Sequence, residues 1–287
     1  MPSDSLNTKR LIGVSCVQAG IWASSMYALN KAWYSNYPRS SFHLFNDIGE
    51  WQQVDKVGHA WSAYLGAQFS TELFRWSGMN RKKSALLGGG VGIAFESVIE
   101  ILDGYSSKWG FSLSDMAANT SGSLIFSLQE FAWQEQRIQF KFSAHKNYYQ
   151  DPQLLLRAND LYGHTLANRI LKDYNAQTYW LSANISSFVP NKSIPAWLNI
   201  AVGYGATGMF GGYTNTWEDE NQNTILRNDI KRIRQFYISP DIDLSKIKIK
   251  GKNPFLLKAL NSIKLKIPMP ALELNSQGQV RFHGLFF

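Results

Sequence analysis

Three groups of polar residues have a spacing that places their side chains on one face of a helix. Residues three or four apart along a helix are neighbours on its surface. The groups are Asp55-Lys56-x-x-His59, Glu100-x-x-Asp103 and Ser112-x-x-Asp115-x-x-x-Asn119. Each group is expected to act as a unit, and the question is what chemistry the three units share.

One histidine and several carboxylates support two kinds of chemistry. Imidazole nitrogen and carboxylate oxygen are ligands of divalent metal ions. Close carboxylates also raise one another's pKa, which suits general acid–base catalysis. The predicted metal ligands are His59, Glu100, Asp103 and Asp115. The catalytic candidates are these four together with Asp55, and the predicted ligand contacts are Lys56, Ser112 and Asn119.

Simpler explanations remain open for these residues. Asp55 and Asp115 could stand at helix N-termini, where a carboxylate meets unpaired N–H groups. Glu100 and Asp103 precede a helix C-terminus, where the helix dipole disfavours each acid by about 0.3–1 kcal/mol, so they need a cation. A buried salt-bridge network without a ligand is the alternative. The sequence contains no HExxH, nucleophile-elbow, phosphate-loop or CxxC motif.

The elements that position these groups are four predicted helices. Their expected ranges are 8–34, 54–76, 83–102 and 114–133. Helices joined by short loops are antiparallel neighbours. The start of the second helix, the end of the third and the start of the fourth should therefore meet at one end of a bundle. Gly88 and Gly92 are spaced for close helix packing.

The second half of the chain has the alternating pattern of β-strands. Strands are predicted over 137–142, 179–188, 197–206, 232–244 and 279–287, and a solvated loop over 214–223. These strands are fewer than the roughly eight of an isolated barrel, which favours a sheet that packs on the helices. The predicted fold class is α+β, with a membrane-associated helical domain over 1–134 and an antiparallel β-rich region over 135–287.

Composition and charge limit the class of protein. Charged residues form 17% of the 287, below the roughly 25% of soluble domains, and aromatic residues form 14%. These values argue against a disordered chain, a collagen or a coiled coil, and the single Cys16 allows no intramolecular disulfide. Residues 11–30 carry no charge, which predicts a membrane span or, alternatively, a signal peptide.

The net charge of +8 leaves two kinds of anionic partner to consider. Basic residues flank the apolar segments, as Lys9 and Arg10 do, and a late run contains Lys246, Lys248, Lys250 and Lys252. Basic residues beside apolar segments are typical of contact with anionic lipid. Membrane lipid is therefore the expected partner, with a protein of an envelope complex as a further one, and nucleic acid is not expected.

The helical half resembles a known family. The segments on which the resemblance rests are Asp55-Lys56-Val57-Gly58-His59, Glu100-Ile101-Leu102-Asp103-Gly104 and the run from Trp109 to Asn119, followed by Gly122. In this order and spacing, over about residues 50–125, they look like the YfiM-like family of uncharacterised bacterial envelope proteins. The same segments are distantly similar to VanZ-like membrane proteins.

The resemblance implies a cell-envelope location, and many members of the family are predicted lipoproteins. This chain departs from that pattern because Cys16 follows too short an apolar run for lipidation. Its long β-rich half is similar to the longer versions from Bacteroidetes-type bacteria. Together these features favour the outer membrane over the inner membrane.

Three functions are carried forward. The favoured one is an envelope membrane protein whose polar patch binds a polar or charged ligand, such as a lipid headgroup, with a divalent metal as a possible cofactor. The first alternative is a hydrolase or transferase that acts on lipid-linked or cell-wall substrates. The second alternative is a structural or assembly subunit of an outer-membrane complex.

Overall fold

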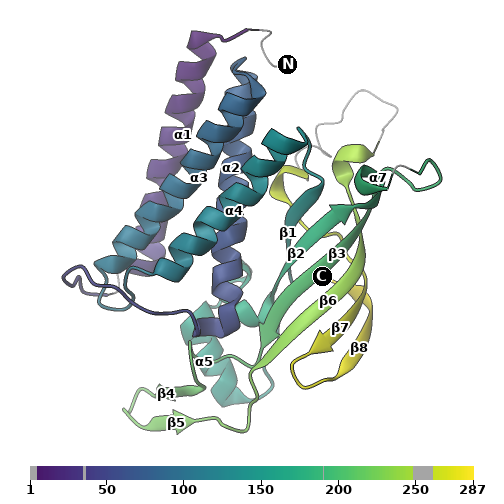
Figure 1. The fold of residues 1–287 in the computed structure, drawn as a ribbon. Helices are drawn as coiled ribbons and strands as arrows, with labels where there is room; N and C mark the ends of the chain where they lie inside the picture. The colour runs from purple at the N-terminus through teal and green to yellow at the C-terminus, as the bar shows by residue number, and fades with distance from the viewer. Residues whose placement is uncertain (1–4, 35–36, 190, 248–260) are drawn as a thin grey trace. The chain divides into compact units, whose positions relative to one another are not determined.

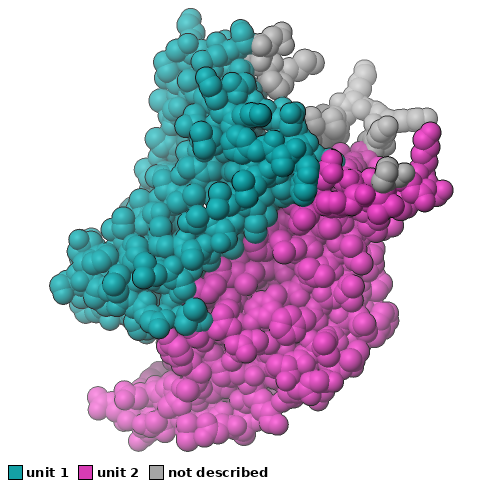
Figure 2. Space-filling model, in the orientation of Figure 1, with its two compact units in different colours: residues 1–48, 58–136 teal, residues 49–57, 137–287 magenta. Residues whose placement is uncertain are grey.

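The computed structural model describes residues 5–34, 37–189, 191–247 and 261–287. The chain forms two compact units, which Figure 2 shows in different colours. The helical unit comprises residues 1–48 and 58–136, and the β unit comprises residues 49–57 and 137–287. The fold is α+β, as predicted: long helices come first, and a six-stranded antiparallel sheet follows (Figure 1).

Four long helices form the first half of the chain, in agreement with the predicted bundle. They are α1 (Thr8–Leu29), α2 (Val54–Trp76), α3 (Arg81–Gly104) and α4 (Leu113–Ala132). A π-helical turn, Asn30–Tyr34, continues α1 to the predicted end. Asn80 begins α3 and Ser112 begins α4, because their side chains accept hydrogen bonds from backbone N–H groups of the first turn.

Glycines bring three of these helices close together. A Cβ at Gly92 would lie 2.8 Å from the Ala63 carbonyl oxygen, and one at Gly88 would lie 2.1 Å from the Thr71 hydroxyl. The predicted packing role of this glycine pair is therefore confirmed, between α3 and α2. The closest approach joins α4 to α2, where a Cβ at Gly122 would lie 1.8 Å from the Ala60 carbonyl oxygen.

Two helices among the described residues are long and apolar enough to cross a membrane. They are α1, near the N-terminus, and α3, of which one third of the most apolar window is buried within the structure. A core helix of a soluble protein and a signal sequence meet the same criterion. Length and composition do not distinguish these cases from a membrane span, so the predicted membrane association stays a proposal.

The β unit consists of one large sheet, a small hairpin and short helices. Its strands are β1 (Ile138–Ala144), β2 (Gln177–Asn184), β3 (Leu198–Thr207), β4 (Thr216–Glu218), β5 (Thr224–Leu226), β6 (Ile233–Ile242), β7 (Met269–Asn275) and β8 (Val280–Phe286). Its helices are α5 (Pro152–Tyr162), α6 (Leu166–Lys172) and α7 (Ile185–Phe188), with 3-10 turns at Glu50–Gln53, Tyr174–Ala176 and Leu244–Lys246.

The large sheet has the order β1-β2-β3-β6-β7-β8, and each neighbouring pair is antiparallel (Figure 1). The residues before β7 also pair with β1, because Phe142 N–H donates to the Lys264 carbonyl and Lys266 N–H donates to the Phe142 carbonyl. A buried cluster of Trp180, Ala201, Tyr237 and Ala271 lies on one face, with Phe286 packed against it.

All five predicted strands exist, but the predictions for this half contained three errors. The strand predicted over 179–188 ends at Asn184, whose side chain accepts from Ser187 N–H and starts α7 instead. The loop predicted over 214–223 contains β4 of the β4–β5 hairpin. Strand β7 and helices α5 and α6 were not predicted. Lys246 ends a 3-10 turn, whereas Lys248, Lys250 and Lys252 lie outside the described residues.

A left-handed turn precedes α2 within the β unit. Trp51, Gln52 and Gln53 have φ values of 48°, 52° and 62°, a conformation that costs an L-residue about 1–2 kcal/mol. Trp51 N–H donates to the Gly212 carbonyl at 2.8 Å, and the Tyr204 hydroxyl donates to the Gln52 carbonyl. These contacts hold the turn in place.

Candidate functional site

His59 is the centre of a polar cluster in the helical unit. It lies in the second turn of α2, with its side chain 19% exposed. Its Nδ1 is 3.2 Å from the Asn119 Oδ1, and its ring nitrogens lie within 3.9 Å of carboxylate oxygens from two other helices. The predicted meeting of three helix ends is therefore present around this imidazole.

Helix α3 contributes two buried carboxylates, one turn apart. Glu100 Oε1 lies 3.7 Å from His59 Nδ1, and Glu96 Oε2 lies 3.9 Å from the same nitrogen. Glu96 also accepts a hydrogen bond from the Ser62 hydroxyl at 2.7 Å. Glu100 Oε2 accepts from Ser112 N–H at 3.2 Å, whereas its Oε1 accepts no hydrogen bond from the described residues.

Helix α4 contributes Asp115 and Asn119 from its first two turns. Asp115 Oδ2 lies 3.9 Å from His59 Nε2, on the opposite side of the ring from Asn119. Ser112 fixes this helix start, because its hydroxyl accepts from Asp115 N–H at 3.0 Å and donates to Asp47 at 2.6 Å. The Ser112 side chain thus serves the helix cap.

Burial controls the ionisation of the acids on α3. Burial raises the pKa of Glu100 to about 8; His59 and Ser112 N–H lower it, while Asp115 and Asp103 raise it. The pKa of Glu96 is also raised by burial, against the opposing effects of His59 and the Ser62 hydroxyl. Three buried carboxylates lie within 3.9 Å of one imidazole, which favours positive charge, either protons or a cation.

The remaining predicted residues have other contacts. Asp103 Oδ1 accepts from the Tyr34 hydroxyl at 2.8 Å, and burial together with Asp103 raises the pKa of Tyr34. Asp55 and Lys56 lie in the first turn of α2, within the β unit. The Lys56 Nζ lies 3.1 Å from Asp55 Oδ2, and the Tyr174 hydroxyl donates to Asp55 Oδ1 at 2.6 Å.

Four of the predicted residues, His59, Glu100, Asp115 and Asn119, therefore lie together, and Ser112 positions two of them. Sequence reasoning missed Glu96, although its place one turn before Glu100 in an apolar helix was a usable signal. It also missed Asp47, which holds Ser112 and Ser114 from a loop. A loop residue has no periodicity that would reveal it.

The cluster offers the donor atoms of a metal site. His59 Nε2 and Asp115 Oδ2 are 3.9 Å apart, so both can reach one ion about 2.0–2.2 Å from each of them. Imidazole with carboxylates suits zinc, manganese or iron. The same groups can exchange a proton, because Glu100, with its pKa raised to about 8, lies 3.7 Å from the His59 imidazole.

Comparison with known proteins gives one match. Residues 44–130 are similar to a family described as "Predicted periplasmic lipoprotein (DUF2279)". No curated protein and no solved structure matches the chain. The matched segment contains α2, α3 and all but the last two residues of α4, and with them the whole His59 cluster. The similarity supports an uncharacterised bacterial cell-envelope family. The YfiM-like and VanZ-like resemblances stay predictions.

Proposed function

We propose that the chain is a cell-envelope protein whose helical unit binds a divalent metal ion through His59 Nε2 and Asp115. The observation that carries the proposal is the arrangement around one imidazole. Asp115 Oδ2 lies 3.9 Å from Nε2, whereas Glu100 Oε1 lies 3.7 Å from Nδ1, the other nitrogen of the ring. A metal ion at Nε2 would then join α2 and α4, with Glu100 of α3 holding the imidazole through Nδ1.

The charge of the cluster favours a cationic ligand over an anionic lipid headgroup. Glu96, Glu100 and Asp115 are all buried, and each lies within 3.9 Å of the His59 imidazole. A phosphate would meet three acids, whereas a divalent cation would offset their desolvation cost. Asp55 precedes His59 by one turn of α2, so it is proposed as a further ligand.

Elemental mass spectrometry on gently extracted protein tests the metal proposal. We expect a stoichiometric divalent metal in the wild type and its loss in His59→Ala and Asp115→Asn. The matched control is Glu130→Gln, which removes another buried acid of the same unit, one that pairs with Arg81 at 2.6 Å near the other end of α3. The control should keep its metal. Wild-type protein that binds neither Zn²⁺ nor Mn²⁺ in calorimetry would overturn the proposal.

A second function is favoured by the raised pKa of Glu100. A carboxyl group with a pKa of about 8 next to an imidazole can act as a general acid, as a hydrolase or transferase of lipid-linked or cell-wall substrates needs. Glu100→Gln should then abolish turnover on a panel of such substrates. Lack of turnover by the wild type on every substrate of the panel would refute the proposed enzyme activity.

We propose the outer membrane as the location within the envelope, because the chain has a long β-rich half. Separation of the two membranes by density should place the protein in the heavier outer-membrane fraction. A fixed stoichiometric partner in gentle extracts would support the assembly-subunit alternative. Recovery in the inner-membrane fraction would refute the placement.

A further inference from the structure

The large sheet exposes apolar residues on one face, in rows that cross the strands. The register aligns Leu181, Val202, Ile238, Leu272 and Phe282 as directly paired neighbours from β2 to β8. Their exposed fractions range from 39% for Leu181 to 73% for Phe282. Every position of this row is thus occupied by a large apolar side chain that is exposed.

Two further rows continue the same face. The row on one side of the first consists of directly paired neighbours, Tyr204, Phe236, Leu274 and Val280. The row on its other side is the pair of Ile200 with Pro240. None of these residues is charged. We call the three rows together the apolar sheet face.

The inner side of the sheet carries several buried ionisable groups. Lys141 lies 2.7 Å from Asp241, Lys266 lies 3.8 Å from the same carboxylate, and His283 lies 2.7 Å from Glu273. Lys141, Asp241, Lys266 and Glu273 are buried. The Ser182 hydroxyl also donates to Asp241. These buried charged groups therefore lie on the inner side of the sheet, and the apolar side chains of the three rows lie on its outer side.

This polarity is the reverse of a sheet that faces water. Antiparallel sheets in soluble proteins place apolar residues inward and polar residues outward, and a contiguous apolar patch of this kind marks an interaction site. Strands that face lipid have apolar residues outward and polar residues inward. The alternation on β3, β6 and β7 follows the second pattern.

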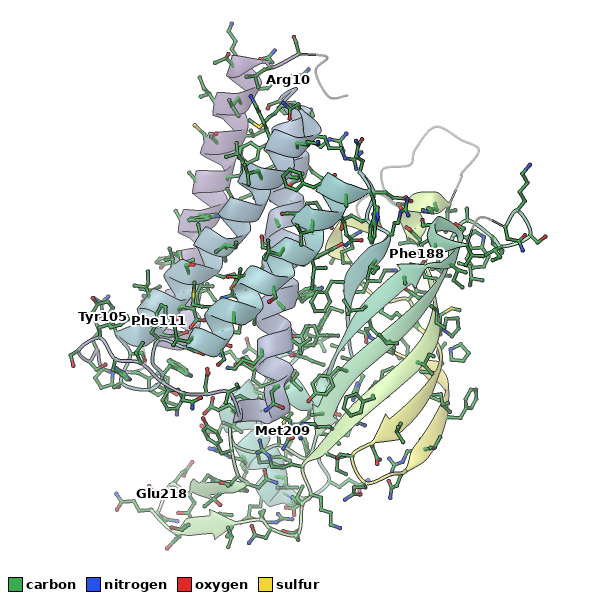
Figure 3. All side chains as sticks on the ribbon, viewed as in Figure 1. Arg10, Tyr105, Phe111, Phe188, Met209 and Glu218 are labelled. Atoms are coloured by element: carbon green, nitrogen blue, oxygen red, sulfur yellow. The ribbon has the colours of Figure 1, made fainter. Side chains whose placement is uncertain are left out.

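Basic and aromatic residues lie at the ends of the strands that border the apolar sheet face. At one end, Asn184 N–H donates to the Arg137 carbonyl, and Trp197 is exposed. The Arg137 guanidinium lies 5.8 Å from the ring centre of Phe188, which Figure 3 labels. At the other end, Arg234 continues the outward positions of β6. Aromatic and basic side chains beside an apolar surface are typical of the membrane interface, where the basic ones attract anionic headgroups.

The size of the face fits one leaflet. The outward positions from Leu198 to Tyr204 on β3 cover about 20 Å at 3.4 Å per residue. The hydrocarbon core of a bilayer is about 30 Å thick. An apolar face of this length needs to enter only the headgroup and upper acyl region of one leaflet, as interfacial apolar faces do.

We propose that the apolar sheet face is a membrane-docking surface that inserts into one leaflet of an anionic bilayer. The buried lysines and carboxylates form its inward side, and the basic and aromatic residues at the strand ends contact the headgroups. This surface lies in the β unit and does not depend on the metal proposal for His59.

A position-specific label tests the proposal in the full chain, because the apolar helix α1 could bind vesicles without the sheet. In a Cys16→Ser background, the environment-sensitive dye NBD is attached through Ile238→Cys or, separately, Leu272→Cys. The vesicles contain phosphatidylcholine and phosphatidylglycerol, with brominated acyl chains as quenchers. The matched control is Leu226→Cys, an exposed leucine on β5, outside the apolar sheet face.

We expect the labels at 238 and 272 to shift to the blue and to be quenched at least twofold by brominated lipid, with the label at 226 unchanged. Ile238→Asp together with Leu272→Asp should abolish quenching of a label at Val202→Cys, with the circular dichroism spectrum unchanged. Unquenched labels at 238 and 272 on vesicle-bound protein would overturn the proposal. A lipid-independent blue shift that grows with protein concentration would overturn it in favour of a second copy.

Discussion

Gly122→Ala probes the contact on which the His59 cluster is built. The added Cβ would lie 1.8 Å from the Ala60 carbonyl oxygen, a backbone atom that has no rotamer by which to escape. Ala60 directly follows His59, and Gly122 lies one turn after Asn119. The substitution therefore acts on the two helices that hold the 3.2 Å contact between His59 and Asn119.

The expected size follows from the overlap. An ordinary contact between Cβ and oxygen is about 3.4 Å, so α2 and α4 must separate locally by about 1.5 Å, and overpacking of this kind costs about 1–3 kcal/mol. Alanine regains up to about 1 kcal/mol through helix propensity. An approach of 1.8 Å to a backbone atom puts the cost near the upper end of that range, about 3 kcal/mol. We therefore expect a net loss of about 2 kcal/mol, together with a His59–Asn119 distance beyond hydrogen-bond range.

Thermal unfolding of the purified chain measures this change, and Gly90→Ala is the matched control. Gly90 lies on α3, and a Cβ there meets no atom within 4 Å. The control should therefore gain about 1 kcal/mol, whereas Gly122→Ala should lower the Tm by about 4–8 °C, at roughly 2–4 °C per kcal/mol for a chain of this size. Its metal content should fall as well. A Tm for Gly122→Ala equal to that of Gly90→Ala would refute the close-packing argument.

Three further substitutions test other parts of the structure. Burial lowers the pKa of Lys266 to about 8, so between pH 8 and pH 10 the unfolded chain binds more protons than the folded chain. The free energy of unfolding should therefore rise with pH over this range by up to about 3 kcal/mol. Urea unfolding of the wild type should show this rise, and Lys266→Met should lack it. Gln52→Gly should stabilise the protein by about 1 kcal/mol in the same assay, because it removes left-handed strain at a φ of 52°. Ser112→Ala should lower the free energy of unfolding by about 1 kcal/mol, because α4 loses its N-cap, and calorimetry should show weaker metal binding. Unchanged metal affinity would show that the cap does not support the site.

The helical unit was largely predictable because its signals are local. Apolar periodicity and capping residues such as Asn80 and Ser112 set the helix ends to within two residues, and antiparallel connection brought His59, Glu100 and Asp115 together. The direction of Asp103 was not predictable, because one turn of spacing leaves open whether a side chain faces His59 or Tyr34. Only the position of Tyr34, from a distant helix, decides it.

The β unit was less predictable because its signals depend on pairing. Strand β7 contains Pro270 and alternates leucines with Glu273 and Asn275, a pattern that resembles a polar loop until its inward side is known. Alternation reveals that a strand has two unlike faces, but it does not reveal which face is inside. The usual assumption places the leucines inside, and the burial of Glu273 shows the opposite.

The two units thus place buried charge in different ways, and the difference bears on function. In the β unit, Asp241 lies beside Lys141 and Lys266, and Glu273 lies beside His283, so each of these two acids has a basic neighbour. Such pairing is what a structural network requires. In the helical unit, the carboxylates of Glu96, Glu100 and Asp115 all lie within 3.9 Å of the His59 ring, and burial raises the pKa of Glu100 to about 8. This concentration of carboxylates around one ring is the physical reason to search for a cation at His59 rather than at Asp241.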